Sequence, residues 1–348
     1  MENKFANIQP VDKENGKKVA AYIDTLTKPL GSLGRLEEIA IQLGEITGEA
    51  FPTVTPPGSI VFAGDHGVVA EGVSAYPQEV TAQMVMNFLQ GGAGINVFTN
   101  QIGAKFEIVD VGVATEMDYE GLVNRKVLKG TRNFCEQDAM TREEVEQAIA
   151  VGYERAEAMI KQQGIKCLIV GEMGIGNTTP SSAILAVLSG KDISELVGHG
   201  TGLAIEKISH KQAVIIRAIE ARQPDINDPI DVLAKIGGLE IAAMTGAMLA
   251  AAENRVPILL DGLICTVSAL LAKGICNDAS DYMIVGHRSV EVGHQTAIDM
   301  LGKKPLVDLG FRLGEGTGAA VAFPILQSAV LMLKEMATFS SAGVSGKE

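Results

Sequence analysis

One pattern recurs along the chain and limits its fold more than any other feature. A short apolar run of strand-forming residues is followed, at once or within a few residues, by a polar loop rich in glycine. These apolar runs occupy residues 59–62, 106–109, 166–170, 256–260, 282–285 and 305–309. The clearest helical patterns between and after them span residues 78–89, 142–163, 181–189, 236–254 and 267–273. Because strands that alternate with helices form βαβ units, the sequence predicts an α/β fold with a mainly parallel sheet flanked by helices.

The polar loops are expected to meet at one edge of this sheet, because parallel strands all point the same way. In open sheets of this kind, ligands bind in the crevice beyond the carboxyl ends of the strands. Side chains that could take part in catalysis or ligand binding follow several of the predicted strands. They are Asp65, His66, Glu172, Asp261, Ser289 and Glu315. We therefore expect a single ligand site at this edge.

The two ends of the chain do not continue the alternation. Residues 12–48 have the pattern of two helices around a turn at 27–34, and residues 319–336 form an apolar helical pattern with Pro324 as an expected kink. We expect these end segments to pack together as a small helical domain. The predicted division is a helical segment at 1–52, a sheet domain at 53–318 and a C-terminal helix at 319–348.

Composition excludes several classes of protein. The net charge of −13 argues against a nucleic-acid surface, and no uninterrupted apolar run approaches the ~20 residues that span a bilayer. The first 15 residues are mostly polar and lack a signal-peptide core, so we expect a cytoplasmic protein. The four cysteines have no CxxC spacing and are expected to be reduced thiols; they are Cys135, Cys167, Cys265 and Cys276. The five histidines form no HExxH or Cys/His cluster, so no metal site is expected.

The loop 314–318, with the sequence GEGTG, places Glu315 among three glycines. Glycines let a backbone approach a ligand closely and adopt positive φ. A carboxylate held in such a loop, beside Thr317, is better placed to act on a bound molecule than to fill a core. The alternative is a tight turn or cap before the apolar helix that follows. The loop by itself does not decide between a catalytic carboxylate and a turn.

A second glycine loop is the strongest signal for phosphate. Segment 174–182 reads GIGNTTPSS, with Thr179 as an expected helix N-cap and Pro180 as an expected first helical residue. A helix N-terminus after a glycine turn presents free N–H groups to an anion. The segment lacks both the Gly-Lys-Ser/Thr ending of a Walker A loop and the full GxGxxG spacing. An ordinary capped helix is therefore the alternative interpretation.

The remaining candidates are weaker. Loop 197–202, with Lys207 and Lys211 downstream, would hold a phosphate between backbone and a point charge, but such glycine turns are common. A histidine beside an aspartate at 65–66 suggests acid/base chemistry, but no third member with triad spacing follows, and structural anchoring is an equal alternative. A carboxylate at Asp261 is typical of ribose binding.

Two further candidates are the carboxylate pair Glu172 and Glu315 and the helix that begins after Ser74. If Glu172 and Glu315 share one crevice, their pKa values would be driven apart and their roles divided. The helix that opens after Ser74 carries Gln83, Met84 and Met86, and such a surface would suit a flat heteroaromatic ligand. For the methionines an amphipathic core helix is the better explanation.

Taken together, the motifs resemble one family. Four segments stand in its order and spacing: 27–34 (TKPLGSLG), 64–68 (GDHGV), 171–179 (GEMGIGNTT) and 313–318 (LGEGTG). The chain is similar to the nicotinate-nucleotide–dimethylbenzimidazole phosphoribosyltransferases of cobalamin lower-ligand synthesis, from about residue 24 to residue 336. The resemblance implies transfer of the 5-phosphoribosyl group from nicotinate mononucleotide to 5,6-dimethylbenzimidazole, giving α-ribazole 5′-phosphate and nicotinate. It also implies a Rossmann-like catalytic domain, a small helical domain, a homodimer and no cofactor.

The resemblance also implies roles for particular residues. Glu315 matches the catalytic base, and Glu172 matches a second active-site carboxylate. Lys211, Asp261 and Ser289 match positions near ribose and phosphate, while Ser74, Gln83 and Leu313 fall where the benzimidazole pocket is expected. The glycine loops add five more expected substrate-binding residues, which are Gly174, Gly176, Asn177, Thr178 and Gly202. His199 departs from the family pattern and receives no role.

The resulting hypothesis is that Glu315 removes the N–H proton of the benzimidazole while its other nitrogen attacks C1′ of the ribose with inversion. No pyrophosphate departs in this reaction, so it requires no magnesium clamp. Two alternatives remain on the same scaffold: a dinucleotide-dependent oxidoreductase, which the incomplete GxGxxG disfavours, and a non-catalytic nucleotide-binding protein. The convergence of several polar residues at one edge exceeds what binding alone requires.

Overall fold

The computed structural model describes residues 7–198 and 205–345 of the 348-residue chain. Within this part the core is a six-stranded sheet in the order β3-β2-β1-β4-β5-β6, and every neighbouring pair is parallel. The strands are β1 Pro57–Gly64, β2 Lys105–Gly112, β3 Leu122–Asn124, β4 Cys167–Met173, β5 Ile258–Leu260 and β6 Met283–Val285. This is the strand order of Rossmann-type doubly wound sheets, so the predicted fold class is confirmed.

The prediction of a strand at 305–309 is wrong. This segment makes an isolated bridge between Val307 and His287 and a hydrogen bond from Leu306 N–H to the carbonyl oxygen of Val285 in β6, but it forms no strand, and Leu309 beyond it is exposed. A strand needs a buried face along its length, which the segment lacks because it leaves the sheet for the surface after Val307. The sixth strand is instead β3, at the opposite edge beside β2, which the sequence analysis did not identify.

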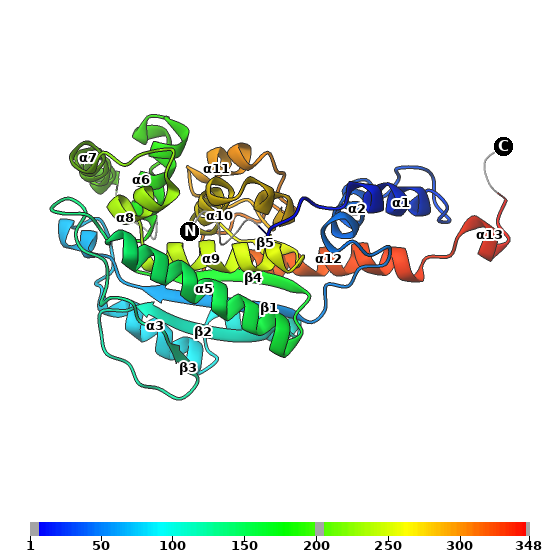
Figure 1. Cartoon of the computed structure of the whole chain (residues 1–348), viewed down its shortest axis with the longest axis horizontal. Helices are drawn as coiled ribbons and strands as arrows, with labels where there is room; N and C mark the ends of the chain where they lie inside the picture. Colours follow the sequence, from blue (N-terminus) through cyan, green and yellow to red (C-terminus); the bar gives the residue numbers. More distant parts are fainter. Residues whose placement is uncertain (1–6, 199–204, 346–348) are drawn as a thin grey trace.

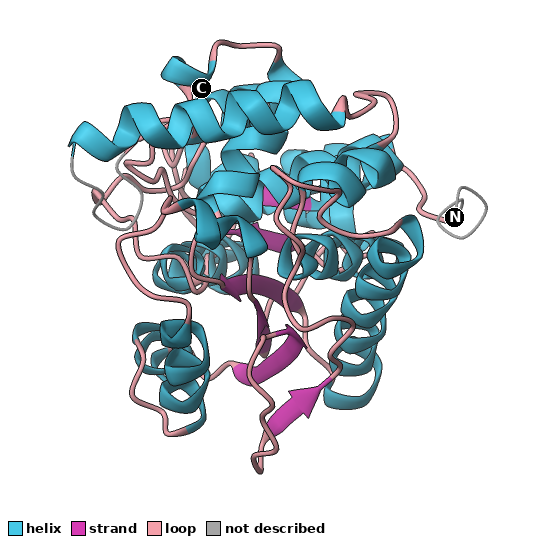
Figure 2. Cartoon of the chain, turned by 90° about the vertical axis from the view of Figure 1, so that its left-hand side faces the viewer, coloured by secondary structure: helices cyan, strands magenta, loops and turns pink. Residues whose placement is uncertain are grey.

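Helices cover the sheet on both sides, as Figures 1 and 2 show. The longer helices are α1 Lys13–Ile23, α2 Arg35–Thr47, α3 Glu79–Leu89, α5 Arg142–Gln163, α6 Thr178–Ser189, α7 Ile205–Arg222, α9 Leu239–Glu253, α10 Leu263–Ile275 and α12 Thr317–Glu335. The shorter ones are α4 Gly94–Gln101, α8 Pro229–Ile236, α11 His294–Leu301 and α13 Phe339–Ala342, with 3₁₀ turns η1 Gly67–Glu71, η2 Ile193–Glu195 and η3 Asn277–Tyr282. The predicted helix at 142–163 is confirmed residue for residue, including its capping box between Thr141 and Glu144.

The strands alternate their side chains between two hydrophobic clusters. On β1, Ile60 and Phe62 belong to the cluster shared with α5, α9 and α10, whereas Val61 and Ala63 belong to the cluster shared with α3, α4 and α12. Successive side chains of a strand point to opposite faces, so this division means that both faces of the sheet are buried. Burial on both faces explains why the strand segments are almost continuously apolar.

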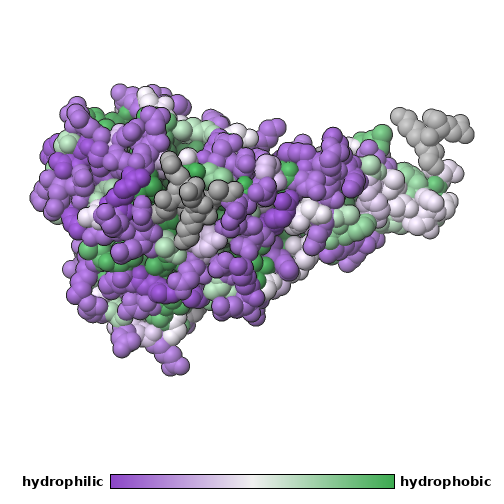
Figure 3. Space-filling view, in the orientation of Figure 1, coloured by the Kyte–Doolittle hydropathy of each residue, from purple (hydrophilic) through white to green (hydrophobic). Residues whose placement is uncertain are grey.

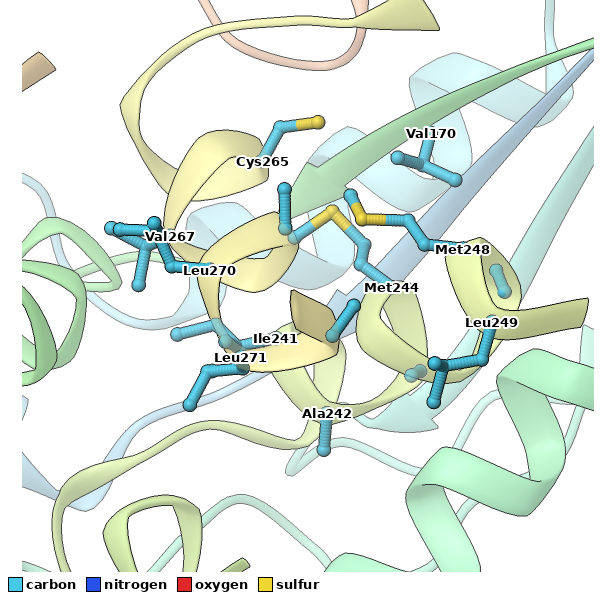
Figure 4. Close-up of a cluster of buried hydrophobic side chains, with 14 of the residues drawn as sticks. Val170, Ile241, Ala242, Met244, Met248, Leu249, Cys265, Val267, Leu270 and Leu271 are labelled. Carbon is cyan, nitrogen blue, oxygen red and sulfur yellow. The ribbon is translucent and has the colours of Figure 1, made fainter. Parts of the chain in front are cut away.

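Helix α9 lies in the interior, with residues from Leu239 to Ala252 all buried. Its methionines and leucines interlock with α10 and with the sheet (Figure 4). It meets α5 at very short range: a Cβ added to Gly152 would lie 1.7 Å from the carbonyl oxygen of Ala243, and one added to Gly246 would lie 1.9 Å from that of Ile149. The two helices therefore contact backbone to backbone, which only glycine allows.

The ends of the chain come together beside the sheet. Val19 and Ile23 of α1 and Leu43 of α2 share a hydrophobic cluster with Phe323 and Leu333 of α12. Figure 1 shows α12 running from the sheet towards α1 and α2, with α13 beyond them. The predicted packing of the end helices is thus present, while the division at residues 52 and 318 stays a prediction.

Helix α12 is the single helix of the described residues that is long and apolar enough to cross a membrane. Of its apolar stretch, 61% is buried inside the protein, as in the core helix of a globular fold. Pro324 lies inside it. The face of the molecule seen in Figure 3 is mostly hydrophilic, with small apolar patches, one of them near the C-terminal end.

Candidate active site

A cavity of about 350 Å³ opens at the carboxyl ends of β4, β5 and β6, at the edge where the sequence analysis places the site. The predicted residues that line it are Ser74, Glu172, Gly174, Gly176, Asn177, Thr178, Asp261, Ser289, Leu313 and Glu315. The cavity thus brings together residues that are far apart in the sequence, such as Ser74 and Glu315, which are 241 positions apart.

Two predicted residues do not line the cavity. Lys211 on α7 is buried, and its Nζ donates to the Oγ1 of Thr178 at 2.6 Å. Gln83 is exposed on α3 and does not line the cavity. Gly202 lies outside the described residues, as does His199.

Glu315 occupies a strained turn at the entrance to α12. Its φ of 64° is one of few positive values at a non-glycine residue, and it stands between Gly314 at 84° and Gly316 at 93°. The side chain is buried, and its Oε2 accepts the backbone N–H of Ile95, in the first turn of α4, at 3.2 Å. Burial raises the pKa of the Glu315 carboxyl; the Ile95 hydrogen bond opposes this and the charge of Asp261 adds to it. The carboxylate is therefore fixed and is a stronger base than a solvated one.

Glycines allow the Glu315 loop to press against β4. A Cβ at Gly171 would lie 2.0 Å from the carbonyl oxygen of Glu315. A Cβ at Gly314 would lie 2.4 Å from Oε1 of Glu172. These two glycines are required because larger residues would displace the loop from the sheet.

Asp261 anchors the same loop from β5. Its Oδ1 accepts the backbone N–H groups of Gly318 at 2.7 Å and Ala319 at 3.1 Å, and its Oδ2 accepts that of Gly316 at 3.2 Å. The carboxylate therefore caps the N-terminus of α12, where unpaired N–H groups and the helix dipole favour an anion. His287 adds a contact from Nε2 to Oδ1 at 3.2 Å. Asp261 lines the cavity as expected, but these contacts give it an anchoring role in addition to the expected ribose contact.

Glu172 sits at the end of β4 between the two glycine loops. Its Oε2 accepts Asn177 Nδ2, and its Oε1 accepts the backbone N–H of Glu315 at 3.4 Å. Burial raises its pKa to about 8, and the negative charges of Glu240 and Asp261 add to this effect. At neutral pH this carboxyl is mostly protonated.

The loop 174–178 opens α6 at the side of the cavity. The predicted cap is wrong by two positions: the N-cap is Asn177, which leaves Thr178 and Thr179 in the first turn and Pro180 as the third helical residue. No side chain caps this end. The buried Lys211 thus contacts the first turn of α6 through the side chain of Thr178. Burial lowers the pKa of Lys211 to about 8, and the charge of Glu291 opposes the shift.

Apolar side chains also line the cavity and are called the apolar wall. They are Val73, Tyr76, Val80, Met84, Ile175, Leu263, Ile264 and Leu313. Met84 thus lines the cavity, whereas the sequence analysis favoured a core role for the methionines of α3. The spacing between Val80 and Met84 contained the signal, because residues four apart on α3 lie on the same helix face and both line the cavity.

Two histidines near the cavity were missed. His294 accepts the backbone N–H of Ser289 at Nδ1 (2.8 Å) and contacts Thr266 at Nε2 (2.9 Å). Burial lowers its pKa to about 3, so the ring is neutral and holds Ser289 in place. His287 follows β6 and lines the cavity beside Asp261. Its position directly after a predicted strand was the available signal.

No group of three or more His, Cys, Asp or Glu side chains in the described part of the chain has the arrangement of a metal site. The four cysteines are free thiols, two buried and two partly buried.

The fold and the cavity define a doubly wound α/β protein with its site at the carboxyl edge of the sheet. Residues 8–344 match the family model described as phosphoribosyltransferase, and the chain belongs to this family. It is 51% identical over 351 aligned residues to the nicotinate-nucleotide–dimethylbenzimidazole phosphoribosyltransferase of Geotalea uraniireducens, covering 100% of this chain and 99% of that protein. It is also 51% identical to the protein of that name from Halalkalibacterium halodurans, over 98% of this chain and 96% of that one.

Solved structures agree with this assignment. The crystal structure of CobT from Thermus thermophilus has a TM-score of 0.92 and 44% identity, over 96% of this chain and 100% of that one. A second crystal structure from that organism, titled as the same phosphoribosyltransferase, has a TM-score of 0.91 and 43% identity, covering 97% of this chain and 100% of that one. The chain is therefore an enzyme of the phosphoribosyltransferase family.

Proposed function

We propose that this enzyme transfers the 5-phosphoribosyl group of nicotinate mononucleotide to 5,6-dimethylbenzimidazole, producing α-ribazole 5′-phosphate and nicotinate for the lower ligand of cobalamin. The observation that carries the proposal is Glu315: a buried carboxylate, held by the N–H of Ile95, that lines the same cavity as an apolar wall. The similarity to relatives named for this reaction supports the choice of substrates.

The base is expected to lie against the apolar wall. A cavity of about 350 Å³ with one apolar side and few polar groups suits a flat heteroaromatic molecule. In this position the ring N–H faces Glu315, while the other ring nitrogen faces the ribose. Met84 and Leu313 would cover the ring, and Ser74 lies at the same side of the cavity.

The phosphoribosyl group is expected to lie at the opposite side. The start of α6 offers the backbone N–H of Thr178, because Thr179 already donates to the carbonyl oxygen of Gly176 and Pro180 has no N–H. Lys211 offers a cation beside Thr178. Ser289 and Asp261 line the space between this turn and Glu315, where the ribose would lie. This arrangement supports the expected phosphate role of Gly174, Gly176, Asn177 and Thr178.

The reaction then requires one proton acceptor. The benzimidazole nitrogen forms a bond to C1′ as the bond from C1′ to the nicotinate nitrogen breaks, and the electron pair of that bond neutralises the pyridinium ring. The N–H proton of the benzimidazole moves to Glu315 as positive charge develops on the attacking base. Attack from the face opposite to nicotinate inverts C1′ from β to α. Orientation of the two substrates supplies much of the remaining rate.

The test is the Glu315→Gln variant, which keeps the size of the side chain and its hydrogen bond from Ile95. We expect release of nicotinate to fall by about 10²–10⁴-fold, the usual contribution of a general base. Glu143→Gln, an exposed change on α5, serves as the matched control. Near-normal turnover of Glu315→Gln would refute the assignment. No nicotinate from the unchanged enzyme with both substrates would refute the proposed function itself.

A cytoplasmic location and a homodimer complete the proposal. The location rests on the composition of the sequence and the homodimer on the family resemblance, and size measurement in solution tests the second. The relatives of this chain do not favour the alternative of a dinucleotide-dependent oxidoreductase, and titration with NADH, followed by fluorescence, would test it.

A further inference from the structure

A buried polar layer lies beneath the loop that opens α6. His66 follows β1, and its Nε2 lies 2.8 Å from Oε1 of Glu240, in the first turn of α9. Both side chains are fully buried. Neither lines the cavity, and the reaction described above uses neither. The sequence had offered Asp65 and His66 as an acid/base pair without a third member, and Glu240 now supplies a partner for the histidine.

The histidine supports the loop directly. A Cβ added to Gly174 would lie 2.4 Å from the carbonyl oxygen of Gly64 and 3.0 Å from Nε2 of His66, so the loop rests on β1 and on the imidazole edge. The next residue, Ile175, donates its backbone N–H to Oγ1 of Thr81 at 3.1 Å. Loop 174–178 is therefore packed against β1 and His66 and hydrogen-bonded to Thr81 of α3.

Stability does not explain this pair. Removing two charges from water is costly, and replacement of a buried ion pair by apolar residues of similar volume is often neutral or stabilising. Here the cost is increased, because Nδ1 of His66 and Oε2 of Glu240 have no hydrogen-bond partner among the described residues. Burial lowers the pKa of His66, but the charge and hydrogen bond of Glu240 outweigh it and the net shift is upward. The charged form of the histidine is thus more favoured than it is in a free imidazole.

We propose that His66 and Glu240 are positioning residues that hold loop 174–178 in the geometry that binds the phosphoribosyl substrate. They act through Gly174, which contacts the imidazole, and of the residues of the apolar wall only Ile175 belongs to this loop. This inference rests on the proposed function, because it assigns the loop to the nucleotide.

The decisive variant is the double change His66→Leu with Glu240→Leu. It removes both charges together and avoids the unpaired buried charge that a single change would create. We expect the KM for nicotinate mononucleotide to rise by about 10–100-fold, since small displacements of positioning groups have effects of this size. The KM for dimethylbenzimidazole and the melting temperature should change little.

The matched control removes a pair elsewhere. Arg155 and Glu107 form a two-bond ion pair at 2.7 Å, and Glu107 lies near the amino end of β2, at the opposite edge of the sheet. Replacing both by leucine should leave both KM values unchanged. An unchanged KM for the mononucleotide in the His66/Glu240 variant would overturn the inference, as would equal increases for the two substrates.

A second variant covers the case in which the double change fails to fold. Glu240→Gln keeps the size and an acceptor oxygen but removes the charge, and we expect a rise of about 3–10-fold in the same KM, by the same positioning argument. An unchanged value in folded Glu240→Gln would contradict the inference. The unchanged enzyme, assayed in parallel, separates this outcome from failure of the proposed function, because only the latter abolishes nicotinate release in that sample.

Discussion

Two regions of this protein use the same packing device for different purposes. In the interior, Gly246 of α9 lets its helix meet the carbonyl oxygen of Ile149 on α5. At the carboxyl edge, Gly171 of β4 lets the sheet meet the carbonyl oxygen of Glu315. The first contact joins the apolar helix α9 to the apolar face of α5, whereas the second holds a buried carboxylate. Close backbone contact therefore stabilises one region and positions a reactive group in the other.

The difference between the regions lies in what is buried around each contact. Around α9 the neighbours are alanine, methionine and leucine, whose burial favours folding (Figure 4). Around Glu315 the neighbours are Glu172 and Asp261, and burying such groups opposes folding unless hydrogen bonds compensate. The buried carboxylates at the carboxyl edge thus lower the free energy of unfolding, whereas burial of the apolar helix faces raises it.

The largest expected effect on this comparison is a pH dependence of stability. The pKa of Glu172 is about 8 in the folded protein, against 4.5 as its usual value. Between these pH values the folded state binds more protons than the unfolded state, so the free energy of unfolding falls as pH rises. Glu172→Gln should remove a decrease on the order of 4 kcal/mol between pH 4.5 and 8.

Denaturant titrations of both proteins at several pH values provide the measurement. The two free energies of unfolding should agree near about pH 5 and separate towards about pH 8, with the variant more stable at high pH. Glu143→Gln is the surface control and should follow the unchanged enzyme. Parallel curves for Glu172→Gln would show that this carboxyl is not held protonated.

The next effect concerns activity. Gly171→Ala places a methyl group 2.0 Å from the Glu315 carbonyl oxygen, so the loop must move. A displacement of about 1 Å at a catalytic group reduces turnover by about 100-fold. We expect kcat to fall by this amount while the protein stays folded. Steady-state kinetics provides the measurement, with circular dichroism as the folding control. A normal kcat in the folded variant would contradict this prediction.

The smallest effect is expected in the interior. Gly246→Ala forces α9 away from Ile149, at a cost of about 1–3 kcal/mol for overpacking, from which the higher helix propensity of alanine subtracts up to about 1 kcal/mol. The free energy of unfolding should fall by about 1–2 kcal/mol, with kcat unchanged for the folded protein. If this variant lost activity without losing stability, the proposal that the interior contact stabilises the fold and does not position the site would be wrong.

The sequence predicts well those elements whose signal is local. Helix α5 was placed correctly because its periodicity and the capping residues Thr141 and Glu144 lie in one continuous segment. The strand ends at Glu172 and Asp261 were found because apolar runs stop there abruptly. Residues 305–309 looked like a strand for the same reason, yet exposure of Leu309 could not be read from composition.

Contacts between distant segments account for what the sequence did not provide. The carboxylate of Asp261 reaches N–H groups 55–58 positions later, and no local pattern encodes that contact. Glu240 was missed because it belongs to an apolar helix pattern, although a lone acid in such a helix is itself a signal of a buried partner. Met84 and Gln83 are neighbours, so only the rotation of α3 decides which one faces the cavity.

Helix α12 joins the loop that carries Glu315 to the ends of the chain, so a tilt of the whole helix would move that loop. Its 19 residues span about 28 Å, with Asp261 holding the first turn and the helices near the N-terminus packed against the far half. A tilt of about 2° at the far end would move the first turn by about 1 Å, the displacement that costs about 100-fold in rate. Tags, truncations or partners attached at either terminus are therefore expected to alter kcat from a distance, without touching the cavity.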